Sequence, residues 1–211
     1  MKRNPRQPTP GALGTGSPGS TGQGNDLIMA NIVNLCLYQL GWFACVLGAA
    51  AQRPWLGMEL GLAFLCLHLI LVRGALRHLA LIAAAGAVGL AADSLQMRWG
   101  VFRYANGMVV GWLAPPWDVV LWLQFATILP FSLRWLSRRY WLSCLAGLVG
   151  GPLAFYAGER LGAITILPPR QPHFALLAAV WSLAMPALVA VCDRLIVAPG
   201  VGGRYRWLSQ T

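Results

Sequence analysis

Charged residues are scarce in this chain. Lys, Arg, Asp and Glu make up 10% of the 211 residues, and only six residues are acidic, whereas a soluble globular domain has about 25% charged residues. Hydrophobic residues make up 57% of the sequence, and the mean hydropathy is +0.60. This composition argues against a water-soluble fold.

The sequence also lacks the short motifs of common enzyme classes. It has no GxSxG, no Walker A loop, no HExxH and no histidines at ligand spacing. The five cysteines form no CxxC pair and fall inside apolar blocks, so we interpret them as small buried hydrophobic residues. We therefore expect no metal and no cofactor, while the sequence does not decide whether the protein is an enzyme.

Long apolar blocks are what the sequence does contain. Residues 27–52 and 140–158 include no ionisable acid or base, and 171–192 include only His173. Helices of this length can cross a hydrocarbon core of about 30 Å. The pattern predicts an all-α membrane protein, a bundle of six transmembrane helices at 28–51, 55–72, 79–97, 117–136, 140–160 and 174–193.

Three regions follow from this pattern. Residues 1–27 are rich in Gly, Pro and Ser and should be disordered; residues 28–196 form the membrane domain, and 197–211 a short basic tail. Met29 directly precedes the first apolar block and is an alternative start. A cleaved signal peptide ending near residues 49–51 is a further alternative, but the apolar stretch is longer than a usual signal sequence.

The basic residues act as topology signals. With six spans, eleven of the sixteen Lys and Arg residues fall on the side of the two termini and five on the other. The positive-inside rule then places both termini in the cytoplasm. The net charge of +10 does not indicate nucleic acid, because the basic residues are scattered between apolar blocks. The lipid bilayer is the expected partner, and the sequence does not predict an oligomeric state.

The one sizeable loop, 98–116, has a pattern of its own. Asn106-Gly107 lies between two short β-prone runs, VFRYA and MVVGWL. Both residues accept the positive φ of a type I′ turn. We therefore predict a short β-hairpin on the outer face, with aromatic residues at the membrane interface.

A polar pocket is predicted near the outer face. Gly86, Gly89, Asp93 and Gln96 recur at helical steps and share one face of the third span, and carboxylates inside a membrane face the bundle interior or water. The first residues of the fourth span and the end of the fifth add polar and aromatic side chains. The ligand-pocket candidates are Asp93, Gln96, Trp117, Asp118, Trp122, Tyr156 and Glu159.

A second interpretation assigns these residues to helix packing. Asp93 and Glu159 would then pair with Arg98, Arg103 or Arg160. In the first span, Asn34, Gln39 and Trp42 are interpreted as helix-packing residues, because polar side chains there form hydrogen bonds between helices. Three GxxxG motifs, starting at residues 57, 147 and 158, are typical of close helix crossings, either inside the bundle or in a dimer, and we favour internal packing.

Four segments resemble the DUF2878 family of small bacterial inner-membrane proteins. They are NIVNLCLYQLGWFACVL at 31–47, the stretch 89–94, PPWDVVLWLQFATILPFSLRWL at 115–136 and GPLAFYAGERLGA at 151–163. LWxxFA and GPLAxYAG are the most specific pieces, and the resemblance covers roughly 29–195. The resemblance implies a bacterial inner-membrane location. Family members are often encoded near enzymes that modify membrane fatty acids, which implies a role in lipid metabolism. Pro130-Phe131-Ser132 departs from the family pattern.

Three functions are compatible with these features. The first is a non-enzymatic membrane protein that binds a lipid or small molecule in the outer pocket. The second is a membrane-embedded enzyme of lipid modification that uses the same carboxylates. The third is a small transporter, which we rank last because the two three-helix halves do not match.

Overall fold

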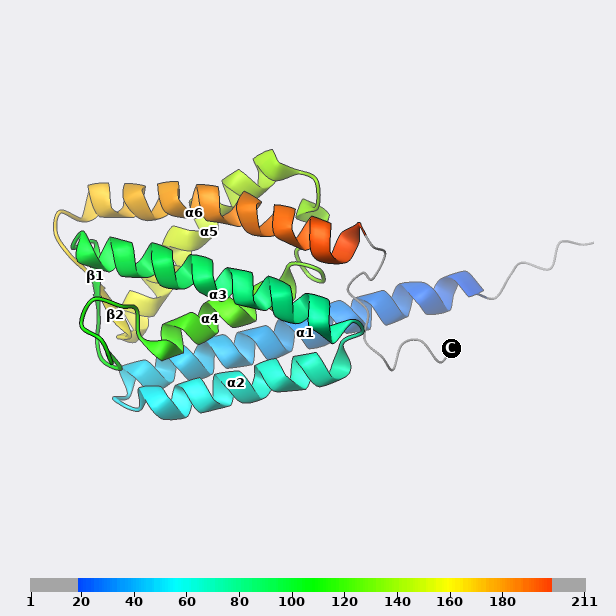
Figure 1. The fold of residues 1–211 in the computed structure, drawn as a ribbon, viewed down its shortest axis with the longest axis horizontal. Helices are drawn as coiled ribbons and strands as arrows, with labels where there is room; N and C mark the ends of the chain where they lie inside the picture. Colours follow the sequence, from blue (N-terminus) through cyan, green and yellow to red (C-terminus); the bar gives the residue numbers. More distant parts are fainter. Residues whose placement is uncertain (1–18, 199–211) are drawn as a thin grey trace, which may run out of the picture.

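The computed structural model describes residues 19–198, which form a bundle of long helices with a small two-stranded sheet at one end (Figure 1). A 3-10 turn follows the fourth helix, and a π-helical turn ends the described chain. The elements in chain order are α1 (Gly19–Ala50), α2 (Pro54–Leu71), α3 (Ala75–Arg98), β1 (Phe102–Tyr104), α4 (Pro116–Ile128), η1 (Arg134–Leu136), α5 (Tyr140–Leu161), β2 (Ile164–Ile166), α6 (Arg170–Cys192) and η2 (Asp193–Val197).

The turns between helices contain the residue types that such turns require. Pro54 is the first residue of α2, where its missing N–H is not needed for helical hydrogen bonding. Gly74 precedes α3 with a φ of 73°, a left-handed conformation that glycine adopts at little cost. Gly162 ends α5 with a φ of 89°. These turns reverse the chain and place consecutive helices side by side.

The surface and interior of the bundle have the polarity expected in lipid. Leu76 and Leu183 are 82% and 73% exposed, whereas Asn34, Gln96 and Gln124 are buried. In water this arrangement would leave large apolar surfaces uncovered; in hydrocarbon, polar groups must instead find partners inside the protein. The chain is therefore a multi-pass membrane protein.

Five helical segments of the described chain are long and apolar enough to cross a membrane. Each has 18 or more residues, and their mean hydropathy over a span-length window is between 1.3 and 2.2. They are Leu27–Ala50, Pro54–Leu71, Ala75–Arg98, Tyr140–Leu161 and Arg170–Val197. They correspond to five of the six predicted spans.

The fourth predicted span, 117–136, is not confirmed as one long helix. α4 has 13 residues, or about 20 Å at ~1.5 Å per residue, and Pro130 follows it with no N–H to continue the ladder. The backbone from 129 to 136 closes local turns with its own hydrogen bonds. This irregular stretch is tolerated because residues 126–131 are all buried in protein.

α4 and η1 nevertheless connect the two ends of the bundle. At the sheet end, Trp117 donates a hydrogen bond to the Asn106 carbonyl oxygen. At the other end, Ser137 and the Arg138 backbone N–H donate to the Asp193 carboxylate, where α6 ends. Between these points α4 packs against α1, α2 and α3. It is the central helix of the bundle.

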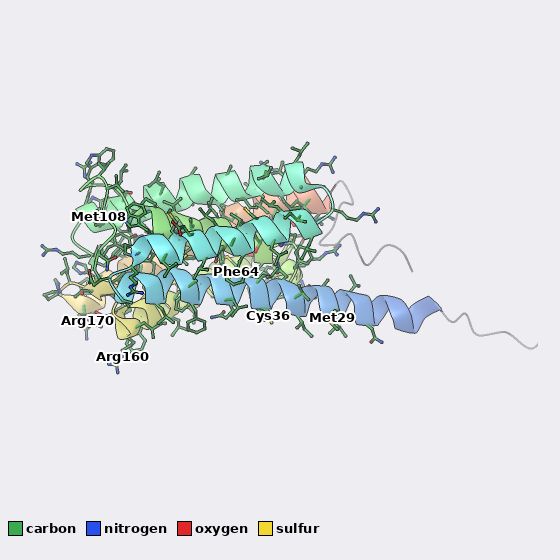
Figure 2. The ribbon with its side chains drawn as sticks, turned by 90° about the horizontal axis from the view of Figure 1, so that it is seen from below. Met29, Cys36, Phe64, Met108, Arg160 and Arg170 are labelled. Carbon is green, nitrogen blue, oxygen red and sulfur yellow. The ribbon has the colours of Figure 1, made fainter. Side chains whose placement is uncertain are left out.

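The ends of α1 and α6 define the polarity of the bundle. The first turns of α1 project past the other helices at the end where α6 finishes (Figure 1). In Figure 2, Met108, Arg160 and Arg170 lie at the sheet end, and Cys36 and Met29 follow along α1 towards the opposite end. The sheet and the α1 N-terminus are therefore at opposite ends of the molecule.

The predicted hairpin across Asn106-Gly107 is wrong. β1 pairs antiparallel with β2, with Arg103 opposite Thr165, so its partner comes from the α5–α6 connection. Gly107 has a φ of 83°, but Asn106 has no positive φ, so the predicted type I′ turn does not form. The Asn106 side chain instead donates to the Ala49 carbonyl oxygen, which ties this loop to the end of α1.

The predicted terminal regions lie mostly outside the described residues. α1 begins at Gly19, so residues 19–27, which the composition assigns to the disordered tail, are helical. The helix continues N-terminally from the apolar block that starts at residue 27, since propagation adds one hydrogen bond per residue. Residues 1–18 and 199–211 are not described.

Candidate functional site

A cavity of about 70 Å³ lies inside the bundle, nearer the sheet end. It is lined mainly by apolar and aromatic side chains, with two carboxyl groups. α1, α3, α4, α5, β2 and α6 all contribute to the lining, which consists of Tyr38, Trp42, Val46, Asp93, Trp117, Asp118, Leu121, Trp122, Phe125, Ala154, Phe155, Gly158, Ala163, Ile164 and Trp181.

Asp93 is held in place by α3 and α4 together. The Trp122 indole Nε1 donates to Asp93 Oδ2 at 2.6 Å, and Gln96 Nε2 donates to Asp93 Oδ1 at 3.2 Å. The indole can approach because Gly89 has no side chain: a Cβ there would lie 2.0 Å from Trp122 Cγ. Gly86, Gly89, Asp93 and Gln96 are all buried, as the predicted shared face requires.

Asp118 lies in the first turn of α4, after Pro115-Pro116 and Trp117. It is 6% exposed, and it interacts electrostatically with Asp93 across the cavity. Its Oδ2 atom is buried and accepts no hydrogen bond within the described part of the chain. Two carboxyl groups from separate helices therefore meet in an apolar environment.

Tyr104 of β1 lies beside these carboxyl groups. Burial raises the pKa of its phenol well above the usual range, and the nearby Asp118 and Asp93 carboxyl groups raise it further. The phenol therefore stays protonated and can act as a donor. Its ring packs edge-on against Trp117, with the ring centroids 5.4 Å apart.

Aromatic rings form the far wall of the cavity. Trp122 and Trp181 stack with centroids 4.5 Å apart and planes 17° from parallel, and Phe125 meets Trp181 edge-on at 5.5 Å. Trp181 approaches α5 at Gly151, where a Cβ would lie 2.1 Å from Trp181 Cγ. The GxxxG motif at 147–151 is therefore an internal α5–α6 contact.

The loop before α4 closes the sheet end of the cavity. The Ala114 backbone N–H donates to Ser94 Oγ at 2.9 Å, which joins the loop to α3. Trp117 Nε1 donates to the Asn106 carbonyl oxygen at 3.2 Å. These bonds fix the start of α4 and hence the position of Asp118.

The seven pocket candidates divide into three groups. Asp93, Trp117, Asp118 and Trp122 line the cavity. Gln96 lies behind Asp93 as its hydrogen-bond donor. Tyr156 and Glu159 lie on α5 outside the cavity lining.

Glu159 has a structural contact instead. Arg170 donates to both of its carboxylate oxygens, at 2.8 and 2.7 Å, and the Ile166 backbone N–H donates at 2.9 Å. The predicted pairing with Arg98, Arg103 or Arg160 is wrong for both acids within the described residues: Glu159 pairs with Arg170, and the donors to Asp93 are Trp122 and Gln96. The contacts of Glu159 join α5 to β2 and α6.

The packing candidates on α1 also differ from one another. Asn34 is buried and donates to the Thr127 carbonyl oxygen at 3.1 Å, as a packing residue should. Trp42 lines the cavity. Gln39 is exposed and makes no interhelical hydrogen bond within the described residues.

A second polar cluster was not predicted from the sequence. His68 of α2 and His78 of α3 are buried, with His68 Nε2 3.5 Å from His78 Nδ1, and Asn34 Nδ2 lies 3.5 Å from His68 Nδ1. The two histidines are ten residues apart, and Arg73, in the turn between α2 and α3, lies midway between them in the sequence. A turn at that position brings the two helix ends together, so this spacing could have predicted the contact. No group of three His, Cys, Asp or Glu side chains in residues 19–198 is arranged to hold a metal ion.

Comparison with known protein families gives a match that covers most of the chain. The model of a protein family of unknown function, DUF2878, matches residues 31–187. The chain belongs to the DUF2878 family. Neither the curated proteins nor the solved structures contain a match to it. The matched range of this DUF2878 protein includes every residue that lines the cavity.

Proposed function

We propose that this DUF2878 protein binds a small molecule or one end of a lipid in the cavity. The observation that supports this is an aromatic, partly enclosed space of about 70 Å³ with two convergent carboxyl groups. Ligand sites are typically concave, mostly apolar and equipped with a few polar groups that fix orientation. Carboxyl groups at membrane depth are costly, which favours a functional role.

The proposal includes an orientation in the bacterial inner membrane. Six arginines lie at the end where α1 begins and α6 finishes: Arg73, Arg77, Arg134, Arg138, Arg139 and Arg194. Five lie at the sheet end: Arg53, Arg98, Arg103, Arg160 and Arg170. The remaining five basic residues belong to the two terminal segments. These segments connect to the end where α1 begins and α6 finishes. The positive-inside rule then places the termini in the cytoplasm and the cavity in the outer half of the membrane.

A cavity-filling substitution tests the binding function. Ala154 lines the cavity, whereas Leu153, its neighbour on α5, is 59% exposed on the outer surface. We expect Ala154→Phe to fill the space. Each variant is purified in a mild detergent, and the small molecules that copurify are extracted and identified by mass spectrometry.

The wild type and Leu153→Phe should retain a common molecule, and Ala154→Phe should lose about nine-tenths of it, since about 1.4 kcal/mol lowers occupancy tenfold. The thermal midpoints of the variants control for folding. Equal retention by a folded Ala154→Phe variant would rule out binding in this cavity.

A lipid-modifying enzyme is the second candidate, favoured by the proximity of Asp93 and Asp118. Two interacting carboxyl groups in an apolar site can hold one proton between them and act as acid and base. Deletion of the gene should then change the membrane lipid profile. Asp93→Asn should fail to restore the profile although the protein inserts normally, whereas a binding protein leaves the covalent structure of the lipids unchanged.

A further inference from the structure

The charges in the cavity are unbalanced. Asp93 and Asp118 line it, and no Lys, Arg or His is among the lining residues. Among residues 19–198, the single ion pair between side chains joins Glu159 to Arg170, outside the cavity. The described part of the protein thus supplies two acidic groups to this space and no basic group.

Burial disfavours a charge on either carboxyl group, but each group also has neighbours that stabilise a negative charge. Asp93 accepts hydrogen bonds from Trp122 and Gln96, and donors to a carboxylate stabilise its charge. Asp118 lies at the N-terminus of α4, where the helix dipole stabilises negative charge. Its polar neighbours in the described part of the chain are the Tyr104 hydroxyl and the Asp93 carboxyl group. Neither of them carries a positive charge, so a bound cation would offset the cost of burying the carboxylate.

The walls of the cavity suit an organic cation better than a metal ion. Trp42, Trp117, Trp122 and Trp181 all contribute to the lining, and indole faces attract ammonium groups with about 0.5–2 kcal/mol each. Metal ions of the hard class require six or more oxygen ligands. Two carboxyl groups among aromatic rings do not provide that number.

The size and position of the cavity indicate the form of the ligand. A volume of about 70 Å³ holds roughly five water molecules, at about 10–15 Å³ for each, and a trimethylammonium group has about the same number of non-hydrogen atoms. The cavity is only partly enclosed, and Trp42 of α1 and Ala154 of α5 are both partly exposed. An alkyl chain can therefore extend between α1 and α5 into the bilayer.

We infer that the cavity binds the ammonium head of an alkylamine or alkyl quaternary ammonium compound, with Asp118 and Asp93 as counterions, aromatic rings around the head, and the chain in the lipid. This inference rests on the proposed binding function and specifies its ligand class. An amine-bearing lipid headgroup and a free alkylamine share this chemistry.

Matched probes test the charge preference. Full-length protein is reconstituted in phosphatidylglycerol nanodiscs, and the thermal midpoint is followed with hexyltrimethylammonium, hexanol or hexanesulfonate. We expect stabilisation by the cation at concentrations at least about tenfold lower than by hexanol, and none by the sulfonate. Asp118→Asn should weaken the cation effect about tenfold or more and leave the hexanol effect within about twofold. Glu59→Gln, an exposed acid on α2, should behave as the wild type.

The outcomes separate the inference from the proposed function. Equal effects of hexanol and the cation that Ala154→Phe abolishes would overturn the cation preference but support the cavity as a binding site. No effect of any probe would overturn both. A second set of nanodiscs that contain phosphatidylethanolamine distinguishes the sources: a weaker response to hexyltrimethylammonium there indicates competition by a lipid headgroup, and an unchanged response indicates a free alkylamine.

Discussion

At the scale of single residues, the site depends on close contacts that glycine permits. Gly89 allows the Trp122 indole to reach Asp93, and Gly151 allows Trp181 to reach the same space. The sequence placed Gly89 and Asp93 on one face of a helix by their spacing. It could not identify Trp122 as the donor to Asp93, because that bond joins residues 29 positions apart.

Gly89→Ala should destabilise the protein and displace Trp122. The added Cβ would lie 2.0 Å from Trp122 Cγ, and overpacking of this kind costs about 1–3 kcal/mol. Gly150→Ala is the matched control, since a Cβ there meets nothing within 4 Å. Thermal midpoints in detergent measure the difference. Equal midpoints for the two variants would contradict the described contact.

At the scale of elements, α4 and the β1–β2 sheet are the departures from a simple helical bundle. The apolar pattern correctly predicted five long helices. It did not predict that Pro130 ends the fourth helix early, because a buried, locally hydrogen-bonded stretch is as apolar as a helix. The hairpin prediction failed because strand pairing depends on which segments the helices bring together.

Engineered disulfides can distinguish the two strand pairings. Arg103 lies opposite Thr165, and opposed strand residues have Cα atoms about 4.5–5.5 Å apart, within the range that a disulfide needs. In a background without the five native cysteines, Arg103→Cys with Thr165→Cys should oxidise nearly completely. Arg103→Cys with Val110→Cys, the pair implied by a hairpin, should remain reduced. Gel mobility before and after reduction reports the result, and the reverse pattern would refute the sheet.

At the scale of the whole molecule, the arrangement of the ends determines which leaflet the cavity faces. The loop segment Asn106-Gly107 lies at the sheet end, and Arg138 lies near Asp193 at the other. If the segment from 117 to 136 completes a pass through the bilayer, these two sites are on opposite sides. That pass is part of the proposed topology.

Labelling of single cysteines measures this sidedness. In intact cells treated with a membrane-impermeant maleimide, Val109→Cys should react and Arg138→Cys should not, in the same cysteine-free background. After permeabilisation both should react, since Val109 and Arg138 are exposed. Reaction of both sites in intact cells, or of neither, would mean that the segment does not cross and that the outer position of the cavity is wrong.

The sequence by itself determined that the protein lies in a membrane and that it consists mainly of long apolar helices. Long apolar blocks and few charges need no tertiary information, because the cost of placing polar groups in hydrocarbon acts on each segment separately. The tertiary structure alone decided that Asp93 and Asp118 meet, that Glu159 binds Arg170 outside the cavity, and that His68 and His78 pair. Such contacts depend on the rotation and depth of each helix against its neighbours, which close packing sets for the bundle as a whole.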